Sequence, residues 1–174
     1  MHRYKSFYCC IALLALLLAR PVYAQESGFQ FPAKLGLGMS RNFLLDAGLV
    51  AFSYIPKANS PRYYDALLDV EVLIGRHTMV MPKLELNAGI LPVGGDGLFV
   101  INAGAETGLL TDFKQAGWVF SPKVGVSIGQ GLFRLYYLRN ILLNDPVLPG
   151  FGRNSVVLEI NIASLQGRRM KVMP

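Results

Sequence analysis

Apolar and polar side chains alternate with a period of two along most of this chain. The clearest case runs from Pro82 to Ile90, where even positions are apolar and odd positions are polar or glycine. Because successive side chains of a β-strand point to opposite faces, each such segment has one apolar and one polar face. The pattern therefore predicts half-buried strands over Ala66–Ile74, Pro82–Ile90, Pro122–Ile128 and Ser155–Ser164.

Four further segments show the alternation less clearly. Glycine, proline and asparagine clusters separate them from their neighbours, with turns expected at Gly75–His77 and Gln115–Gly117, for example. One of the four is apolar on both faces apart from Asp46, so its register is left open. The added strands are Ala33–Ser40, Phe43–Ile55, Leu98–Leu110 and Leu132–Leu143. The total is about eight strands of roughly 8 to 13 residues, close to the length that a tilted strand needs to cross a bilayer.

The first 24 residues have a different organisation. Arg3 and Lys5 precede an unbroken apolar run from Ile11 to Ala19, and small residues stand at the −3 and −1 positions before Gln25. This order is typical of a secretory signal peptide, and the apolar run is too short to span a bilayer. We expect a cleaved signal peptide at residues 1–24 and one β-barrel domain at residues 25–174.

Composition narrows the class of protein. Cys9 and Cys10 belong to the predicted signal peptide, so the mature chain has neither a disulfide framework nor a thiolate metal site. Three of the 17 lysines and arginines precede Gln25, which leaves 14 against 11 acidic residues and a net charge near +3. A nucleic-acid partner is therefore not expected. Only 16% of residues are charged, against about 25% in an ordinary soluble domain.

The polar faces of the predicted strands hold glycine, asparagine, serine and a few charges of both signs. Such residues suit the inside of a narrow closed barrel, which side chains just fill. The apolar faces carry almost no charge, as a lipid-facing band requires. We therefore predict a polar network inside the barrel, formed by Asp69, Glu71, Lys83, Glu85, Asn87, Asn102, Glu106, Lys123, Ser127, Arg134, Glu159 and Asn161.

Aromatic residues gather near the ends of the predicted strands. In membrane proteins such residues form girdles at the two membrane–water interfaces, although β-propensity alone also places aromatic residues in strands. The girdle candidates are Phe43, Tyr54, Tyr63, Tyr64, Phe99, Phe113, Trp118, Phe120 and Tyr137.

With this pattern, the chain from about Ala33 to Leu165 resembles the small eight-stranded outer-membrane β-barrels of Gram-negative bacteria. The resemblance implies an all-β, antiparallel up-and-down barrel in the outer membrane that contacts outer-membrane lipid and the outer-membrane assembly machinery. It also implies a structural or surface-loop role rather than an enzymatic one. The chain departs from such barrels in its basic tail, Arg168–Pro174, where many of them end on an aromatic residue. It also departs in its short Gly75–Thr78 turn on the side where long loops are usual.

Residues that could carry chemistry are few. His77 is the one histidine after the signal peptide, and a hydrolase or acyltransferase resembling the lipid A-modifying barrels would have to use it with a serine and a carboxylate. No spacing singles out such a serine, and an exposed turn histidine is the simpler interpretation. Calcium binding by the strand carboxylates lacks a loop signature. We expect no catalytic residue, no cofactor and no metal site.

Two other functions remain open at this point. A soluble periplasmic barrel similar to the lipocalins would share the alternation but invert the faces, with an apolar ligand in its lumen. A lipid A-modifying barrel enzyme would share the membrane location and use His77.

Overall fold

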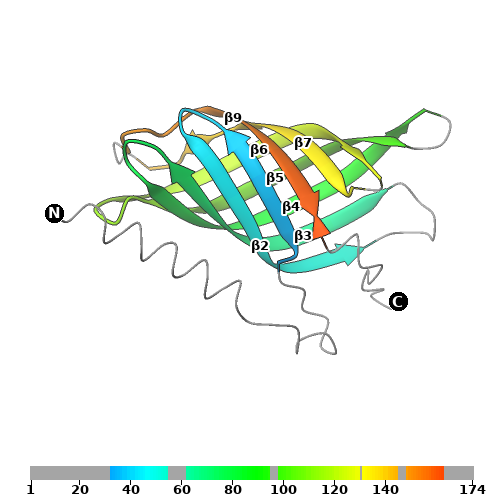
Figure 1. Cartoon of the computed structure of the whole chain (residues 1–174), viewed down its shortest axis with the longest axis horizontal. Helices are drawn as coiled ribbons and strands as arrows, with labels where there is room; N and C mark the ends of the chain where they lie inside the picture. The colour runs from blue at the N-terminus through cyan, green and yellow to red at the C-terminus, as the bar shows by residue number, and fades with distance from the viewer. Residues whose placement is uncertain (1–31, 55–61, 95–97, 130, 145–147, 163–174) are drawn as a thin grey trace.

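The computed structural model describes residues 32–54, 62–94, 98–129, 131–144 and 148–162 (Figure 1). The predicted signal peptide lies outside these residues. The described residues form one antiparallel sheet of nine strands: β1 (Lys34–Met39), β2 (Phe43–Tyr54), β3 (Tyr63–Ile74), β4 (Met79–Val93), β5 (Phe99–Thr111), β6 (Ala116–Ile128), β7 (Phe133–Arg139), β8 (Ile141–Leu142) and β9 (Asn154–Asn161).

The sheet closes on itself as an up-and-down barrel. Neighbours in sequence pair with each other from β1 to β6, and β9 pairs with both β7 and β1. β7 and β8 pair with β6 in one continuous register, so they are a single strand interrupted at Asn140. The predicted closed barrel of eight antiparallel strands is therefore confirmed. Within the described residues, no helix is long and apolar enough to cross a membrane.

The alternation of faces follows the sequence pattern, with the polar side inward. In β4, Leu84 and Leu86 are 41% and 52% exposed, whereas Lys83 and Glu85 between them are 6% and 0% exposed. The same alternation of exposed apolar and buried polar positions runs through β3, β6 and β9. The outer wall of the barrel is thus apolar and much of its interior is charged.

Two local predictions are wrong. The turn expected at Gln115–Gly117 lies at Asp112–Gln115, and β6 begins at Ala116, well before Pro122. The cause is the Asp112 carboxylate, which accepts hydrogen bonds from the backbone N–H groups of Lys114 (2.9 Å) and Gln115 (2.8 Å) and so closes the turn early.

Tyr63 is also misplaced in the predicted aromatic girdle. Its side chain is only 1% exposed and points into the barrel. It lies two residues before Asp65 on β3, and therefore on the same inward face of the strand. Its ring lies against Gly89 of β4, where an added Cβ would come within 2.5 Å of a ring carbon. Gly89 therefore leaves the space that an inward-facing aromatic ring requires at this level of the barrel.

The two ends of the barrel differ (Figure 1). The hairpin end carries the β1–β2, β3–β4 and β5–β6 turns and the β8–β9 connection, toward the left of the figure, and the terminal end carries the start of β1 and the end of β9. At the hairpin end the interior is closed by an apolar cap, formed by Leu73, Met79, Met81, Leu110, Val119 and Leu148 with Leu142 and Phe151 packed against them. Leu148 and Phe151 lie in residues 148–153, the described part of the β8–β9 connection that precedes β9, and this segment packs over this end of the interior.

Candidate functional site

An ionic network fills the middle of the barrel, and Lys34 stands at its centre. The Lys34 Nζ atom, at the start of β1, donates to Asp46 Oδ2 of β2 at 2.7 Å and to Asp69 Oδ2 of β3 at 2.6 Å. It also donates to Glu85 Oε2 of β4 at 2.5 Å. An ammonium group has three N–H donors, so these three carboxylates satisfy it fully.

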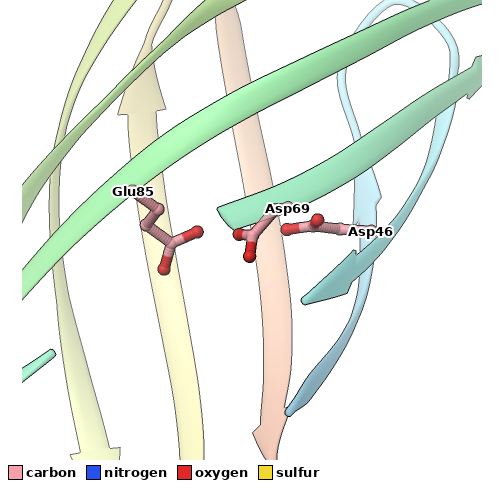
Figure 2. Close-up of side chains that lie close together, drawn as sticks. All are labelled: Asp46, Asp69 and Glu85. Carbon is pink, nitrogen blue, oxygen red and sulfur yellow. The ribbon is translucent and has the colours of Figure 1, made fainter. Parts of the chain in front are cut away.

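The same three carboxylates form a geometric candidate for a metal site. Figure 2 shows Asp46, Asp69 and Glu85 directed toward one another, and one oxygen from each lies within 4.8 Å of the others. Divalent cations such as Ca²⁺ bind oxygen donors of this kind. Here the Lys34 ammonium takes the position between the oxygens, at hydrogen-bond distance from all three. The site is therefore built to hold a lysine side chain.

A second lysine extends the network toward the hairpin end. Lys83 Nζ lies 2.8 Å from Glu71 Oε2 and 2.8 Å from Glu106 Oε2. It also lies 3.2 Å from Asp46 Oδ2, the oxygen that Lys34 contacts. Asp46 thus joins the two lysines into one cluster.

A third lysine extends it across the barrel. Lys123 Nζ lies 2.7 Å from Glu85 Oε1 and 3.3 Å from Glu159 Oε1, and 4.2 Å from the centre of the Tyr136 ring, which is cation–π geometry. Because Glu85 contacts both Lys34 and Lys123, the three lysines belong to a single network. Its members come from β1 through β6 and from β9, that is, from seven of the eight barrel strands.

A separate pair lies toward the terminal end. Arg134 of β7 forms a salt bridge with Asp65 of β3, and its Nε donates to the carbonyl oxygen of Gly131 at 2.8 Å. The guanidinium carbon lies 4.6 Å from the centre of the Tyr63 ring. The Tyr63 hydroxyl in turn contacts Ser127 Oγ at 3.2 Å. This cluster locks the Arg134 side chain across the barrel from β7 to β3.

The charges in the interior are unequal in number. Among the described buried residues there are four cations and seven carboxylates. A buried charge is costly unless it is paired, and each of the four cations contacts at least one carboxylate. The buried cations are therefore outnumbered by the carboxylates, and a single cation contacts several carboxylates at once.

The structure places all twelve residues of the predicted polar interior inside the barrel, at 6% exposure or less. Arg134 and Asn161 both lie within hydrogen-bond distance of Asp65, Ser127 Oγ donates to Asn102 Oδ1 at 3.2 Å, and Asn87 Nδ2 donates to Glu85 Oε1 at 2.5 Å. The lysine network takes in the other members: Asp69, Glu71, Lys83, Glu85, Glu106, Lys123 and Glu159.

Sequence reasoning left three charged residues of the interior out of this set: Lys34, Asp46 and Asp65. Asp65 could have been found, because it lies four positions before Asp69 and therefore on the same face of a strand. Asp46 stands alone in an apolar segment, and its register became clear only from the pairing of β2 with β3.

The remaining candidate residues lie elsewhere. His77 is exposed in the β3–β4 turn, and no hydrogen bond or ion pair links it to a serine or a carboxylate within the described residues. The other girdle candidates with described side chains face outward, while the side chain of Tyr54 lies outside the described part of the chain. Those at the hairpin end are Phe43, Phe113, Trp118, Phe120 and Tyr137, and those at the terminal end are Tyr64 and Phe99.

Comparison of the chain with protein-family models, with curated proteins and with solved structures finds no match.

Proposed function

We propose that this chain is an outer-membrane β-barrel protein with a structural role in the cell envelope. The observation that carries the proposal is the inverted distribution of polarity. Among the described residues, 28 large apolar side chains on the outside of the molecule are 37–68% exposed. The one outward-facing charged side chain within the described strands is Arg139, at the hairpin end.

A lipid surrounding explains this wall better than water does. Soluble proteins rarely expose contiguous apolar patches larger than a few hundred Å². A barrel similar to the lipocalins would also need an apolar lumen, whereas the middle of this interior is ionic. In hydrocarbon, a closed barrel leaves no strand edge with unpaired backbone groups.

Strand length is compatible with the thickness of a bilayer. β2 and β3 have 12 residues each. At about 3.3 Å per residue and a tilt of about 40°, such a strand spans about 30 Å along the membrane normal, the thickness of the hydrocarbon core.

A structural role is favoured over transport or loop-mediated binding. The side chains that fill the interior are almost completely buried, which favours a packed tube over an open channel. At the hairpin end, the first three strand connections have only three or four residues. The longer β8–β9 connection places Leu148 in the apolar cap.

The test compares two arginine substitutions on the outer wall. Leu86, halfway along β4, is 52% exposed, and Leu143, just beyond β8 at the hairpin end, is 61% exposed. In a membrane, Leu86→Arg should cost about 2–4 kcal/mol of stability, whereas Leu143→Arg should cost about 0–1 kcal/mol, because the penalty depends on depth. Heat-modifiable gel migration and recovery in the outer-membrane fraction are the measurements.

In water both substitutions would add charge to an already exposed position and would be equally harmless. Recovery of the parent protein in the soluble periplasmic fraction without detergent, with Leu86→Arg folding as well as Leu143→Arg, would refute the membrane assignment.

A further inference from the structure

Three arginines gather at one place on the hairpin end. Arg139 is the last residue of β7 and pairs with Asn154, the first residue of β9. Arg153 directly precedes Asn154, and Arg41 lies in the β1–β2 turn next to Ser40, whose Oγ donates to the Asn154 carbonyl oxygen at 2.9 Å. All three arginine side chains are exposed.

Asn140 fixes the segment that carries Arg153 against the strand that carries Arg139. Its backbone N–H donates to the Arg153 carbonyl oxygen at 2.7 Å. Its side-chain Nδ2 donates to the Gly152 carbonyl oxygen at 2.8 Å and to Ser155 Oγ at 2.7 Å. The interruption between β7 and β8 therefore serves to hold two arginine-bearing segments side by side.

Gly152 brings the third segment close. A Cβ at this position would lie 2.0 Å from Ser40 Oγ and 2.8 Å from the backbone nitrogen of Arg41, so only glycine permits the observed approach of the β1–β2 turn. The segment that carries Arg153 thus contacts both the segment of Arg41 and that of Arg139, through hydrogen bonds and close packing. Such preorganisation lowers the entropic cost of binding a ligand.

The three arginines have no acidic partner among the described residues. Within the described part of the chain, Arg41 and Arg153 form no salt bridge, and Arg139 contacts the neutral side chain of Asn154, at 3.3 Å. Asp112, the acidic residue described in the hairpin-end connections, uses its carboxylate to accept the backbone N–H groups of its own turn. Three neighbouring positive charges repel one another unless an anion lies between them.

The apolar wall beside the cluster indicates the kind of anion. Tyr137 lies two residues before Arg139 on the same outer face, is 47% exposed, and donates its hydroxyl to Asn154 Oδ1 at 2.9 Å. An amphipathic tyrosine at the border of an apolar band marks the depth of lipid headgroups. At that depth the abundant anion is phosphate, which guanidinium groups bind in bidentate fashion.

We propose that Arg41, Arg139 and Arg153 form a binding site for the phosphate headgroup of a lipid in the leaflet around the hairpin end. This inference rests on the proposed membrane location. It assigns the exposed end of the barrel a ligand of defined chemistry.

The experiment uses the full chain, folded in neutral detergent and titrated with phosphatidic acid or phosphatidylcholine under native mass spectrometry. The test variant is Arg139→Gln/Arg153→Gln. The matched control is Arg76→Gln/Lys114→Gln, which removes the same charge from exposed positions in two other turns of the same end. Heat-modifiable migration shows that each variant has folded.

The parent should prefer phosphatidic acid, and the test variant should lose affinity for it by on the order of tenfold or more. The control should change by no more than about twofold. Equal binding of the two lipids by the parent, or an equal loss in both variants, would overturn the site. Competition by inorganic phosphate at the same concentration as the lipid would identify a site for free phosphate instead.

Failure of the proposed function would be recognised separately. Insertion into vesicles of phosphatidylcholine alone, reported by a blue shift in the fluorescence of the single tryptophan, Trp118, tests the membrane assignment without any anionic lipid.

Discussion

The ionic network and the apolar cap fill the same tube by opposite means. Around Lys34 the contacts are directional hydrogen bonds between charges, and each depends on a partner at a fixed distance. Around Met79 the contacts are non-directional packing among aliphatic side chains. The stability of the middle of the barrel therefore depends on a complete set of charged partners, whereas that of the cap depends on how well the side chains fill its volume.

Loss of the central cation should have the largest effect. Lys34→Met keeps much of the side-chain volume but leaves three buried carboxylates without the ammonium they share. Breaking a buried charge cluster in this way costs about 3–5 kcal/mol. Urea unfolding of the vesicle-inserted protein measures it, with the exposed Lys114→Met as the control for the same chemical change. An unfolding midpoint equal to that of the parent would contradict the proposed dependence on partners.

A cavity in the cap should have the next largest effect. Met79 is fully buried in the cap, and Met79→Ala should cost about 3 kcal/mol, within the range of 2–5 kcal/mol seen for such truncations. Met79→Leu, which conserves volume, should cost less than about 1.5 kcal/mol. If the two variants unfold at the same urea concentration, packing volume is not what the cap contributes.

Neutralising one carboxylate should matter much less than removing a lysine. In Glu71→Gln the shape is kept, and Lys83 retains Glu106 at 2.8 Å and Asp46 at 3.2 Å. Because carboxylates outnumber cations in the interior, we expect a change within about 1 kcal/mol. Urea unfolding measures this change in the free energy of unfolding. A loss as large as that of Lys34→Met would show that removing one carboxylate costs as much stability as removing one cation.

The smallest effect is expected at Asp112, outside both regions. The backbone N–H groups of Gln115 and Lys114 lower the pKa of this carboxyl group. A lowered pKa in the folded state adds stability above the ordinary aspartate pKa of about 4, and this contribution disappears as the pH falls through the lowered value.

The Asp112→Ala variant should therefore be slightly less stable than the parent at pH 7, and the difference should narrow in acid. Asp112→Asn, which keeps the acceptor oxygen without the charge, should fall between the two. A difference that is constant from pH 7 to pH 2 would exclude the ionised carboxyl group as its cause.

The fold was predictable because alternation is a local property. In the segment from Lys83 to Ile90, the alternation of polar and apolar residues by itself indicates which side chains face inward. β2 was harder, since Leu44 faces inward beside Asp46 and a β-bulge between Gly48 and Val50 shifts the register. Tyr63 was misassigned because the predicted strand began only at Ala66; extending the spacing of Asp69 back through Asp65 would have placed Tyr63 on the inward face.

The site was less predictable because its contacts are distant in sequence. Lys34 is separated from Asp69 by 35 residues and from Glu85 by 51 residues. Strand parity indicates that these side chains are buried, but only the closed barrel and its register bring them to one level. The arginine cluster has the same origin, because Arg41 and Arg153 become neighbours only through the pairing of β1 with β9.

The pairing of β1 with β9 also constrains how the molecule is assembled. These strands have six and eight residues and stand at opposite ends of the described chain, so closure of the ring depends on two short strands that are distant in sequence. A chain truncated before Asn154 would retain two open edges and would lack Glu159 beside Lys34 and Lys123. Pairing of β9 with β1 thus closes the barrel and also supplies Glu159, the carboxylate that β9 contributes to the ionic network.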